Sequence, residues 1–531
     1  MTDNAAVAAP AGGTTFATRR EFMIVLPGLL LTLMIAMLDQ LVVSTALPRI
    51  VGDLGGLNHL AWVVTAYVLA STITTPLYGK LGDLYGRKRL LMIAIIIFLI
   101  GSALSGLSHN MDQLIAFRAL QGLGAGGLMV GAIATIGDMV SPRERGQYMG
   151  YMMAAMMVAM IAGPLVGGYI TDSLSWRWIF YINMPIGGAA LVYLWATMHL
   201  PRRRVQHRVD YLGAAVIAIG ATAIVLLTTW GGTQYAWGSW EIIMLAGITA
   251  AAIVAFFFVE GRAAEPVLPL HVFKNRNFSL ASSMSFLLGF VMLGALTFLP
   301  LYQQTVQHAS PTTSGLMLIP LMLGSTVTTL FAGQFTTRTG RYKILPVIGG
   351  VVMTVAIYLL THLGPQTTRL NSALYFVVLG VGMGFLMQIT SLIVQNSVEQ
   401  KDMGVASSSR AFFQQIGGSM GVSLFGVIFI HRLTSTMASK LPGVHLPAGG
   451  AALNPATVNS KPLPIREAAF FAISKGLDSV FWWTIPASAL VFLLALWVKE
   501  IPLRGRNDSP AQPAAVTTEQ LEAEAADLGA I

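Results

Sequence analysis

Long apolar runs separated by short polar turns occupy the chain from residue 22 to residue 499. Most of the runs hold about 20 residues or more, the length that an α-helix needs to cross the roughly 30 Å hydrocarbon layer of a bilayer. The pattern predicts an all-α polytopic membrane protein. Its fourteen expected spans are 22–47, 60–79, 90–108, 112–137, 147–171, 177–198, 210–230, 240–260, 278–303, 313–335, 344–363, 371–395, 404–431 and 476–499.

The distribution of lysine and arginine predicts how this bundle is oriented. With the N-terminus inside, the interior segments hold twenty-two of these residues, whereas the short exterior turns hold only Arg49, Arg177 and Arg369. Cytoplasmic loops of membrane proteins carry such an excess of positive charge. We therefore expect a multi-pass protein of the cell (cytoplasmic or inner) membrane, surrounded by lipid bilayer, with both termini in the cytoplasm.

Composition narrows the class further. Hydrophobic residues make up 55% of the chain and charged residues only 10%, against about 25% charged in soluble proteins. The net charge of +9 follows the turns, and no basic run with interleaved aromatics predicts a nucleic-acid partner. The chain has no cysteine, and no metal, nucleophile–base or phosphate-loop pattern predicts an enzyme or a cofactor. An ion gradient is the remaining energy source.

A short basic turn occurs twice and reveals two related halves. Gly79, Gly86 and Arg87 return as Gly333, Gly340 and Arg341, each 254 residues later. Further matches at shifts of 252 to 258 relate the first six spans to the last six, which leaves the seventh and eighth as an inserted pair. Duplicated halves are typical of secondary transporters.

This repeat predicts the domain organisation. We expect a cytoplasmic segment at 1–21, a six-helix bundle at 22–198, an inserted helix pair with cytoplasmic linkers at 199–277, a second six-helix bundle at 278–499 and a flexible cytoplasmic tail at 500–531. The second bundle includes a long exterior loop at 432–475. The loop and the tail are better interpreted as solvated connectors than as binding segments.

Four motifs are similar to those of a known family. They run from Asp39 to Pro48, from Gly79 to Arg89, from Arg118 to Gly124 and from Gly163 to Gly168. Over roughly residues 20–500 the chain resembles the major facilitator superfamily, and within it the fourteen-helix drug:proton antiporter branch (EmrB/QacA type). The resemblance implies a major facilitator fold of six, two inserted and six helices. It also implies a proton gradient as the energy source and hydrophobic or cationic small molecules as substrates. We expect the protein to be a monomer.

Asp39 is the only acidic residue well inside a predicted span. An intramembrane carboxylate is costly and is a functional candidate by default. Arg118 is its candidate partner, because both residues lie roughly 9–12 Å below the exterior surface at 1.5 Å per residue. Burial disfavours the charged carboxylate and a nearby cation favours it, so a conformational change could switch its protonation. The alternative is a static buried pair that only fixes helix packing.

The duplicated turn and the fifth span carry candidate gating residues. Glycines in the turn permit close helix approach, and in the family this segment is a gate latch, a role that falls here on Asp83 and Arg87. The alternative is a plain positive-inside anchor. In the fifth span a proline interrupts the helix. In the family this motif marks exporters, which implies a gating role. A role in packing alone is an equally open alternative. The gating candidates are Gly79, Gly82, Asp83, Gly86, Arg87 and Lys88 in the turn, and Gly163, Pro164, Gly167 and Gly168 in the fifth span.

The substrate cavity is the least defined prediction. Flexible methionines suit a promiscuous apolar pocket, although a methionine stripe is more often packing or lipid contact. The candidates are Trp62, Tyr67, Met153, Met156, Gln303, Gln388 and Gln414.

Three hypotheses for function follow. The first is a proton-coupled antiporter that exports amphipathic toxic compounds by alternating access. The second is a dedicated exporter of an endogenous lipid or secondary metabolite, which works by the same mechanism. The third, a membrane scaffold or sensor that transports nothing, leaves the intramembrane Asp39 unexplained.

Overall fold

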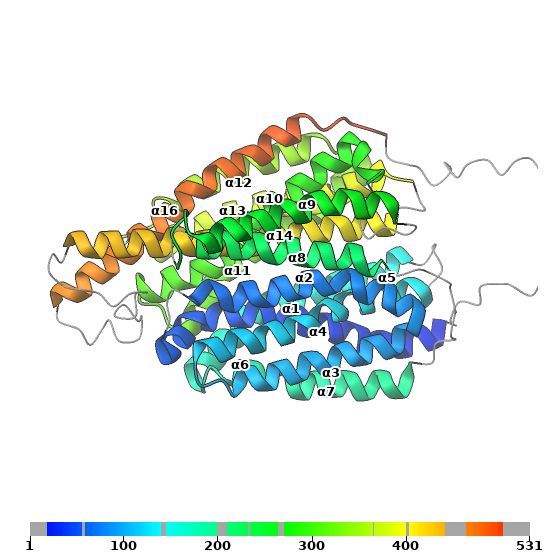
Figure 1. The fold of residues 1–531 in the computed structure, drawn as a ribbon, viewed down its shortest axis with the longest axis horizontal. Coiled ribbons are helices and arrows are strands. Elements are labelled where there is room, and N and C mark those ends of the chain that lie inside the picture. The colour runs from blue at the N-terminus through cyan, green and yellow to red at the C-terminus, as the bar shows by residue number, and fades with distance from the viewer. Residues whose placement is uncertain are drawn as a thin grey trace, which may run out of the picture.

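The computed structural model describes residues 19–55, 59–139, 145–198, 210–231, 234–263, 270–364, 366–399, 403–440 and 463–502. Long helices lie side by side in one bundle (Figure 1). They are α1 (Arg19–Leu54), α2 (Leu60–Tyr85), α3 (Arg87–Gly106), α4 (Met111–Met139), α5 (Arg145–Ser173), α6 (Trp178–Tyr181), α7 (Asn183–Thr197), α8 (Tyr211–Trp230), α9 (Trp240–Arg262), α10 (Arg276–Thr305), α11 (Pro311–Thr339), α12 (Ile344–Leu360), α13 (Arg369–Ser397), α14 (Met403–Lys440) and α16 (Leu463–Leu496).

The prediction of an all-α membrane protein is confirmed. Within the described residues, 12 helices are long and apolar enough to cross a membrane, with α6 and α7 counted as one. The two remaining predicted spans are also helical. One is α12, which is apolar but has 17 residues, and the other is α5, which has 29 residues and contains Pro164. Each expected span therefore corresponds to a helix.

Several helices run further than the apolar pattern predicted. Helix α1 continues through Pro48 to Leu54, because Ile50 and Val51 are buried there. Helices α14 and α16 cover both ends of the expected 432–475 loop and project beyond the other helices at the left of Figure 1. Buried residues such as Met437 and Ile473 continue the apolar face beyond the predicted spans. The middle of that loop, the N-terminal segment up to residue 18 and the tail from 503 lie outside the described residues.

Glycine geometry supports the internal repeat. Gly86 joins α2 to α3 with a φ of +94°, and Gly340 joins α11 to α12 with a φ of +69°. Both values lie in the region that favours glycine over residues with a side chain. The two glycines are 254 residues apart in sequence, so both copies of the turn place a glycine with positive φ after their first helix. The backbones differ beyond that, because ψ is 131° at Gly86 and −3° at Gly340. In Figure 1 the half formed by α1–α7 lies below the half formed by α10–α16.

The two halves meet near one face of the bundle, where α1 ends and α2 begins. We call this the α1–α2 face, and the opposite one, where α2 meets α3, the α2–α3 face. Between described residues, the hydrogen bonds that join the halves lie from the α1–α2 face to the middle of the bundle. They link Gln304 to Thr45, Thr312 to Asp172, Thr65 to Ser423 and Thr72 to Gln415, at 2.7–3.1 Å. The halves are therefore closed together at the α1–α2 face.

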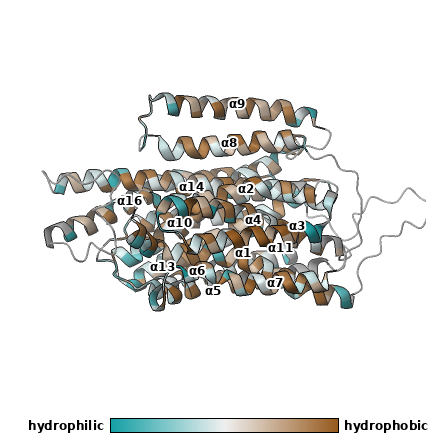
Figure 2. Ribbon diagram, turned by 60° about the horizontal axis from the view of Figure 1, so that its bottom comes forward, coloured by the Kyte–Doolittle hydropathy of each residue, from teal (hydrophilic) through white to brown (hydrophobic). Residues whose placement is uncertain are grey.

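The inserted pair covers one seam between the halves. Helix α8 packs against both α2 and α14, and α9 packs on the outside of α8 (Figure 2). Leu69 of α2 and Val225 of α8 form an apolar cluster with Met420 of α14. Trp62 of α2 belongs to the same cluster, with its ring 6.4 Å from that of Trp230. The pair is thus seated across the two halves rather than on one of them.

Candidate functional site

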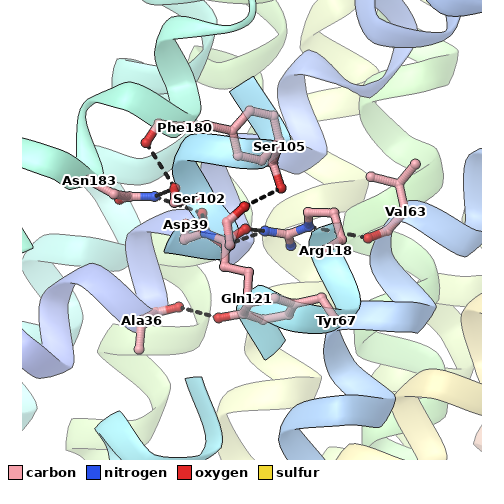
Figure 3. A network of polar contacts seen from close by, with 11 residues as sticks. Ala36, Asp39, Val63, Tyr67, Ser102, Ser105, Arg118, Gln121, Phe180 and Asn183 are labelled. Atoms are coloured by element: carbon pink, nitrogen blue, oxygen red, sulfur yellow. Dashed lines mark hydrogen bonds and ion pairs between the residues drawn. The ribbon is translucent and has the colours of Figure 1, made fainter. Parts of the chain in front are cut away.

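A buried ion pair lies at the centre of the first half. Asp39 on α1 and Arg118 on α4 are each 1% exposed, and Arg118 Nη1 donates to Asp39 Oδ2 at 2.5 Å (Figure 3). Arg118 Nε also donates to the Val63 carbonyl of α2 at 3.4 Å. The structure therefore brings together the two residues that the sequence analysis paired by depth.

Two amides complete the site. Gln121 Nε2 and Asn183 Nδ2 both donate to Asp39 Oδ1, at 2.8 and 2.9 Å. Gln121 stands one turn after Arg118 and also accepts from its Nη1 at 2.8 Å. Asn183 is the first residue of α7, after the break that separates α6 from α7. It also donates to Ser102 Oγ of α3 at 2.9 Å, so α4 and α7 bind the carboxylate of α1 directly and α3 is joined to it through Asn183.

The sequence analysis missed both amides, although they lie in segments that it had examined. A polar residue one turn from an intramembrane arginine was the available signal for Gln121. Asn183 lies in a segment, Trp176 to Pro185, that is also similar to the antiporter branch, but its place beside Asp39 depends on how α7 packs against α1.

This geometry fits an ionised Asp39. Arg118, Gln121 and Asn183 all donate to the carboxylate, and charge-assisted hydrogen bonds of this kind are stronger than neutral ones. The aromatic rings of Tyr67 and Phe180 flank Arg118, with centroids 4.1 and 5.8 Å from its Cζ. Loss of either charge would leave the other one buried without compensation. Protonation of Asp39 would remove the charge that keeps Arg118 in place.

The second half carries no charged pair at the positions equivalent to Asp39 and Arg118. Val291 and Phe376 occupy the positions that match Asp39 and Arg118 in the repeat, and both are completely buried. Apolar packing therefore replaces the charged site there. Of the two related halves, the first contains the Asp39–Arg118 ion pair.

The turn's Gly79 and Gly86 do not lie at close helix contacts, because a Cβ at Gly79 would be 3.6 Å from Val130 Cγ1 and one at Gly86 would meet no described residue within 4 Å. Arg87 folds back over α2 and donates to the Gly79 carbonyl at 3.1 Å, and a Cβ at Gly82 would lie 3.1 Å from Arg87 Nη1. Lys88 donates to the Trp195 carbonyl at 2.7 Å in the last turn of α7. The side chain of Asp83 lies outside the described residues, so the latch stays a prediction.

The helix-5 motif lies where three helices meet. A Cβ at Gly163 would come within 2.7 Å of Leu41 Cβ on α1, and one at Gly167 within 2.9 Å of Val42 Cα. Gly168 faces the other half, where a Cβ would come within 2.6 Å of Thr312 Cα on α11. The motif therefore serves packing within the first half and close contact between the halves at once.

A small cavity lies beside the ion pair. Its volume is about 40 Å³, and the described residues that line it come from α1, α2, α4 and α14. At roughly 10–15 Å³ per water, it holds a few waters rather than a drug-sized molecule. Its polar lining consists of Gln40, Tyr67, Ser71, Thr75 and Gln415. Of the predicted cavity residues, Tyr67 alone lines it.

The other predicted cavity residues lie elsewhere. Trp62 packs in the α8 cluster, and Gln303 is completely buried and accepts from Ser314 Oγ at 2.7 Å. Gln388 and Met156 are partly buried, and the side chain of Met153 lies outside the described residues. Gln414 accepts from Arg410 Nη1 at 3.0 Å. Arg410 is an intramembrane cation that the sequence analysis did not single out.

Two related halves of membrane-spanning helices, with an intramembrane carboxylate buried in the first half, are the architecture of a secondary transporter. Residues 29–422 match the family model described as Major Facilitator Superfamily, and the chain belongs to this superfamily. It is a transporter and not an enzyme, and its relatives include multidrug transporters.

An uncharacterized MFS-type transporter of Mycobacterium tuberculosis (strain H37Rv) is 40% identical over 498 residues, which cover 94% of this chain and 72% of the relative. The multidrug transporter protein MdtP of Bacillus subtilis (strain 168) is 37% identical over 418 residues, which cover 79% and 77%. The crystal structure of a bacterial homolog to the human lysosomal transporter Spinster, inward-facing and unoccupied, matches with a TM-score of 0.64 and 14% identity. It covers 90% of this chain and 98% of that one and supports the fold alone.

Proposed function

We propose that the chain is a proton-coupled antiporter of the fourteen-helix drug:proton branch. It exports amphipathic, hydrophobic or cationic compounds across the cytoplasmic membrane as a monomer, without a cofactor. The observation that carries this proposal is the buried Asp39 carboxylate, which three donors from two other helices hold in its charged form. A site that only fixed packing would not need a charge, as Val291 and Phe376 illustrate in the second half.

The orientation follows from the charge distribution. We assign the α1–α2 face to the exterior and both termini to the cytoplasm. The hydrogen bonds between the halves then close the exterior side, and substrate enters from the cytoplasm or the inner leaflet. Gly168 permits the close contact of α5 with α11 that this closure requires.

Transport exchanges a proton for a substrate molecule. When the exterior side opens, Asp39 takes up a proton and substrate leaves. When the interior side opens, Asp39 releases the proton to the cytoplasm and substrate binds. A proton that moves down roughly 150 mV supplies on the order of 3.5 kcal/mol, which sustains a substrate gradient of a few hundredfold.

Inverted membrane vesicles test this proposal. With an ethidium-type dye and a lumenal pH indicator, the wild type should accumulate dye at the expense of the proton gradient. Asp39→Asn should abolish both signals, whereas Asp112→Asn, which changes an exposed acid at the start of α4, should preserve them. Exchange that survives Asp39→Asn would refute the role of Asp39. A wild type that exchanges none of a panel of dyes would favour a dedicated lipid or metabolite exporter.

A further inference from the structure

Arg410 of α14 lies inside a membrane span, in surroundings that differ from those of Arg118. Its Nη1 donates to Gln414 Oε1 at 3.0 Å. Among the described residues, its Nε is buried without a hydrogen-bond partner, and no acid forms an ion pair with it. Arg118, by contrast, donates to a carboxylate, an amide and a backbone carbonyl. A buried charge is costly unless it is paired, and the described part of the chain supplies Arg410 with no counter charge.

The guanidinium of Arg410 is held inside the span. Arg410 follows the start of α14 at Met403 by roughly 10 Å, at 1.5 Å per residue. Long cationic side chains near a helix end usually extend to the membrane interface. Here the bonded partner is Gln414, which lies one turn further from that end. The bond therefore keeps the positive charge within the membrane.

Arg410 belongs to a polar face of α14 that lies between the two halves. At 3.6 residues per turn, Ser407, Arg410, Gln414 and Gln415 fall within an arc of about 140°. All four are partly exposed, although they lie in an apolar span. Gln415 accepts from Thr72 of the first half at 2.9 Å, and the carbonyl of Gln414 packs against α10. Polar groups inside a membrane face the interior of the bundle or a water-filled space, so this face is oriented towards the space between α2 and α10.

We propose that Arg410, positioned by Gln414, binds the negatively charged group of an amphipathic molecule; the inference rests on the proposed export and adds amphipathic acids to its substrates. A guanidinium binds a carboxylate or phosphate group through two parallel hydrogen bonds, and the Nε of Arg410 is an available donor for one of them. In the proposed orientation the acid reaches this site from the cytoplasm or the inner leaflet. The ligand supplies the counter charge that Arg118 receives from Asp39.

The test compares two ligands that differ in charge. Purified full-length protein in nanodiscs of zwitterionic lipid is titrated into a dansyl-labelled fatty acid or into the primary amide of that acid, and binding is measured by fluorescence anisotropy against empty nanodiscs. The wild type should bind the acid more tightly than the amide. Arg410→Gln should weaken binding of the acid by roughly tenfold to a hundredfold, the worth of a hydrogen bond to a charged group, and should leave binding of the amide unchanged.

Matched variants separate recognition of the charge from general effects. Arg410→Lys keeps the positive charge and should retain part of the preference for the acid. Arg432→Gln makes the same substitution at an exposed position of the same helix and should bind both ligands as the wild type does. Nanodiscs that contain phosphatidylglycerol identify the source of the acid group. Unchanged binding of the fatty acid favours a small exported acid, and competition favours the headgroup of an anionic lipid.

Thermal unfolding provides a second readout. Without ligand, Arg410→Gln should unfold at the wild-type temperature or above it, because it removes a charge that has no counter charge. The fatty acid should raise the unfolding temperature of the wild type more than that of Arg410→Gln. A loss of stability in Arg410→Gln as large as that of Arg118→Gln would show that Arg410 is already paired, and would overturn the inference.

The outcomes distinguish this inference from the proposed antiport. Equal binding of acid and amide by the wild type, which needs no variant to measure, would overturn the role of Arg410. So would an acid preference that survives Arg410→Gln or that Arg432→Gln abolishes. None of these results affects dye–proton exchange in inverted vesicles. Failure of that exchange, together with an acid preference that depends on Arg410, would refute the antiport and leave the binding site intact.

Discussion

Replacing either Asp39 or Arg118 alone by a neutral residue should lower the free energy of unfolding more than replacing both together. In Asp39→Asn, Arg118 stays buried at 1% exposure without its counter charge, and the new amide turns a donor towards one of the groups that now donate to the carboxylate. Removing one partner of a buried ion pair costs about 3–5 kcal/mol. Arg118→Gln leaves the opposite charge buried and should cost a similar amount.

The double variant Asp39→Asn/Arg118→Gln removes both charges, so it should recover most of the lost stability. Thermal unfolding in detergent measures all four members of this cycle, and a coupling free energy of about 2 kcal/mol or more is expected for residues in direct contact. The double variant should fold normally and still fail to couple dye to protons. Additive losses, or a fully coupled double variant, would refute the reasoning.

Three further predictions use the same chain, whose lack of cysteine allows clean spin labelling. Gly168→Ala should move the two halves apart at the α1–α2 face, because its Cβ would meet Thr312. Spin-label distances between α5 and α11 should therefore lengthen. Gly188→Ala, which has open space around it, should leave these distances unchanged. Gly86→Ala should cost about 1–3 kcal/mol in unfolding measurements, because residues with a side chain rarely adopt its φ of +94° and ψ of 131°. Gly188→Ala again serves as the control. Asn183→Leu should lower the unfolding free energy by about 1.5–3 kcal/mol through loss of its bond to the charged Asp39, and an unchanged stability would contradict the donor role.

The architecture could be predicted from sequence because its causes are local. Apolar length sets the spans, and a glycine such as Gly86 or Gly340 marks a turn that other residues adopt at a cost. The helix ends were less predictable. Whether α14 continues to Lys440 depends on burial against neighbouring helices, and no local residue encodes that contact.

Part of the site could be predicted because its signal is also local in the sequence. Asp39 and Arg118 stood out because a charge in an apolar span is rare. The contact of Asn183 with Asp39 could not be predicted, since it depends on the packing of α7. Trp62 was expected in the cavity but packs against α8, because the seat of an inserted helix pair is a tertiary property.

The central claim is that Asp39 carries the transported proton, and infrared difference spectroscopy tests it most directly. When substrate is added to the protein in mildly acidic buffer, the carbonyl band of a protonated carboxyl group should disappear and a carboxylate band should appear. Both changes should be absent in Asp39→Asn. A substrate-induced carboxyl signal that persists in Asp39→Asn, or no such signal in a wild type that releases protons, would contradict the account.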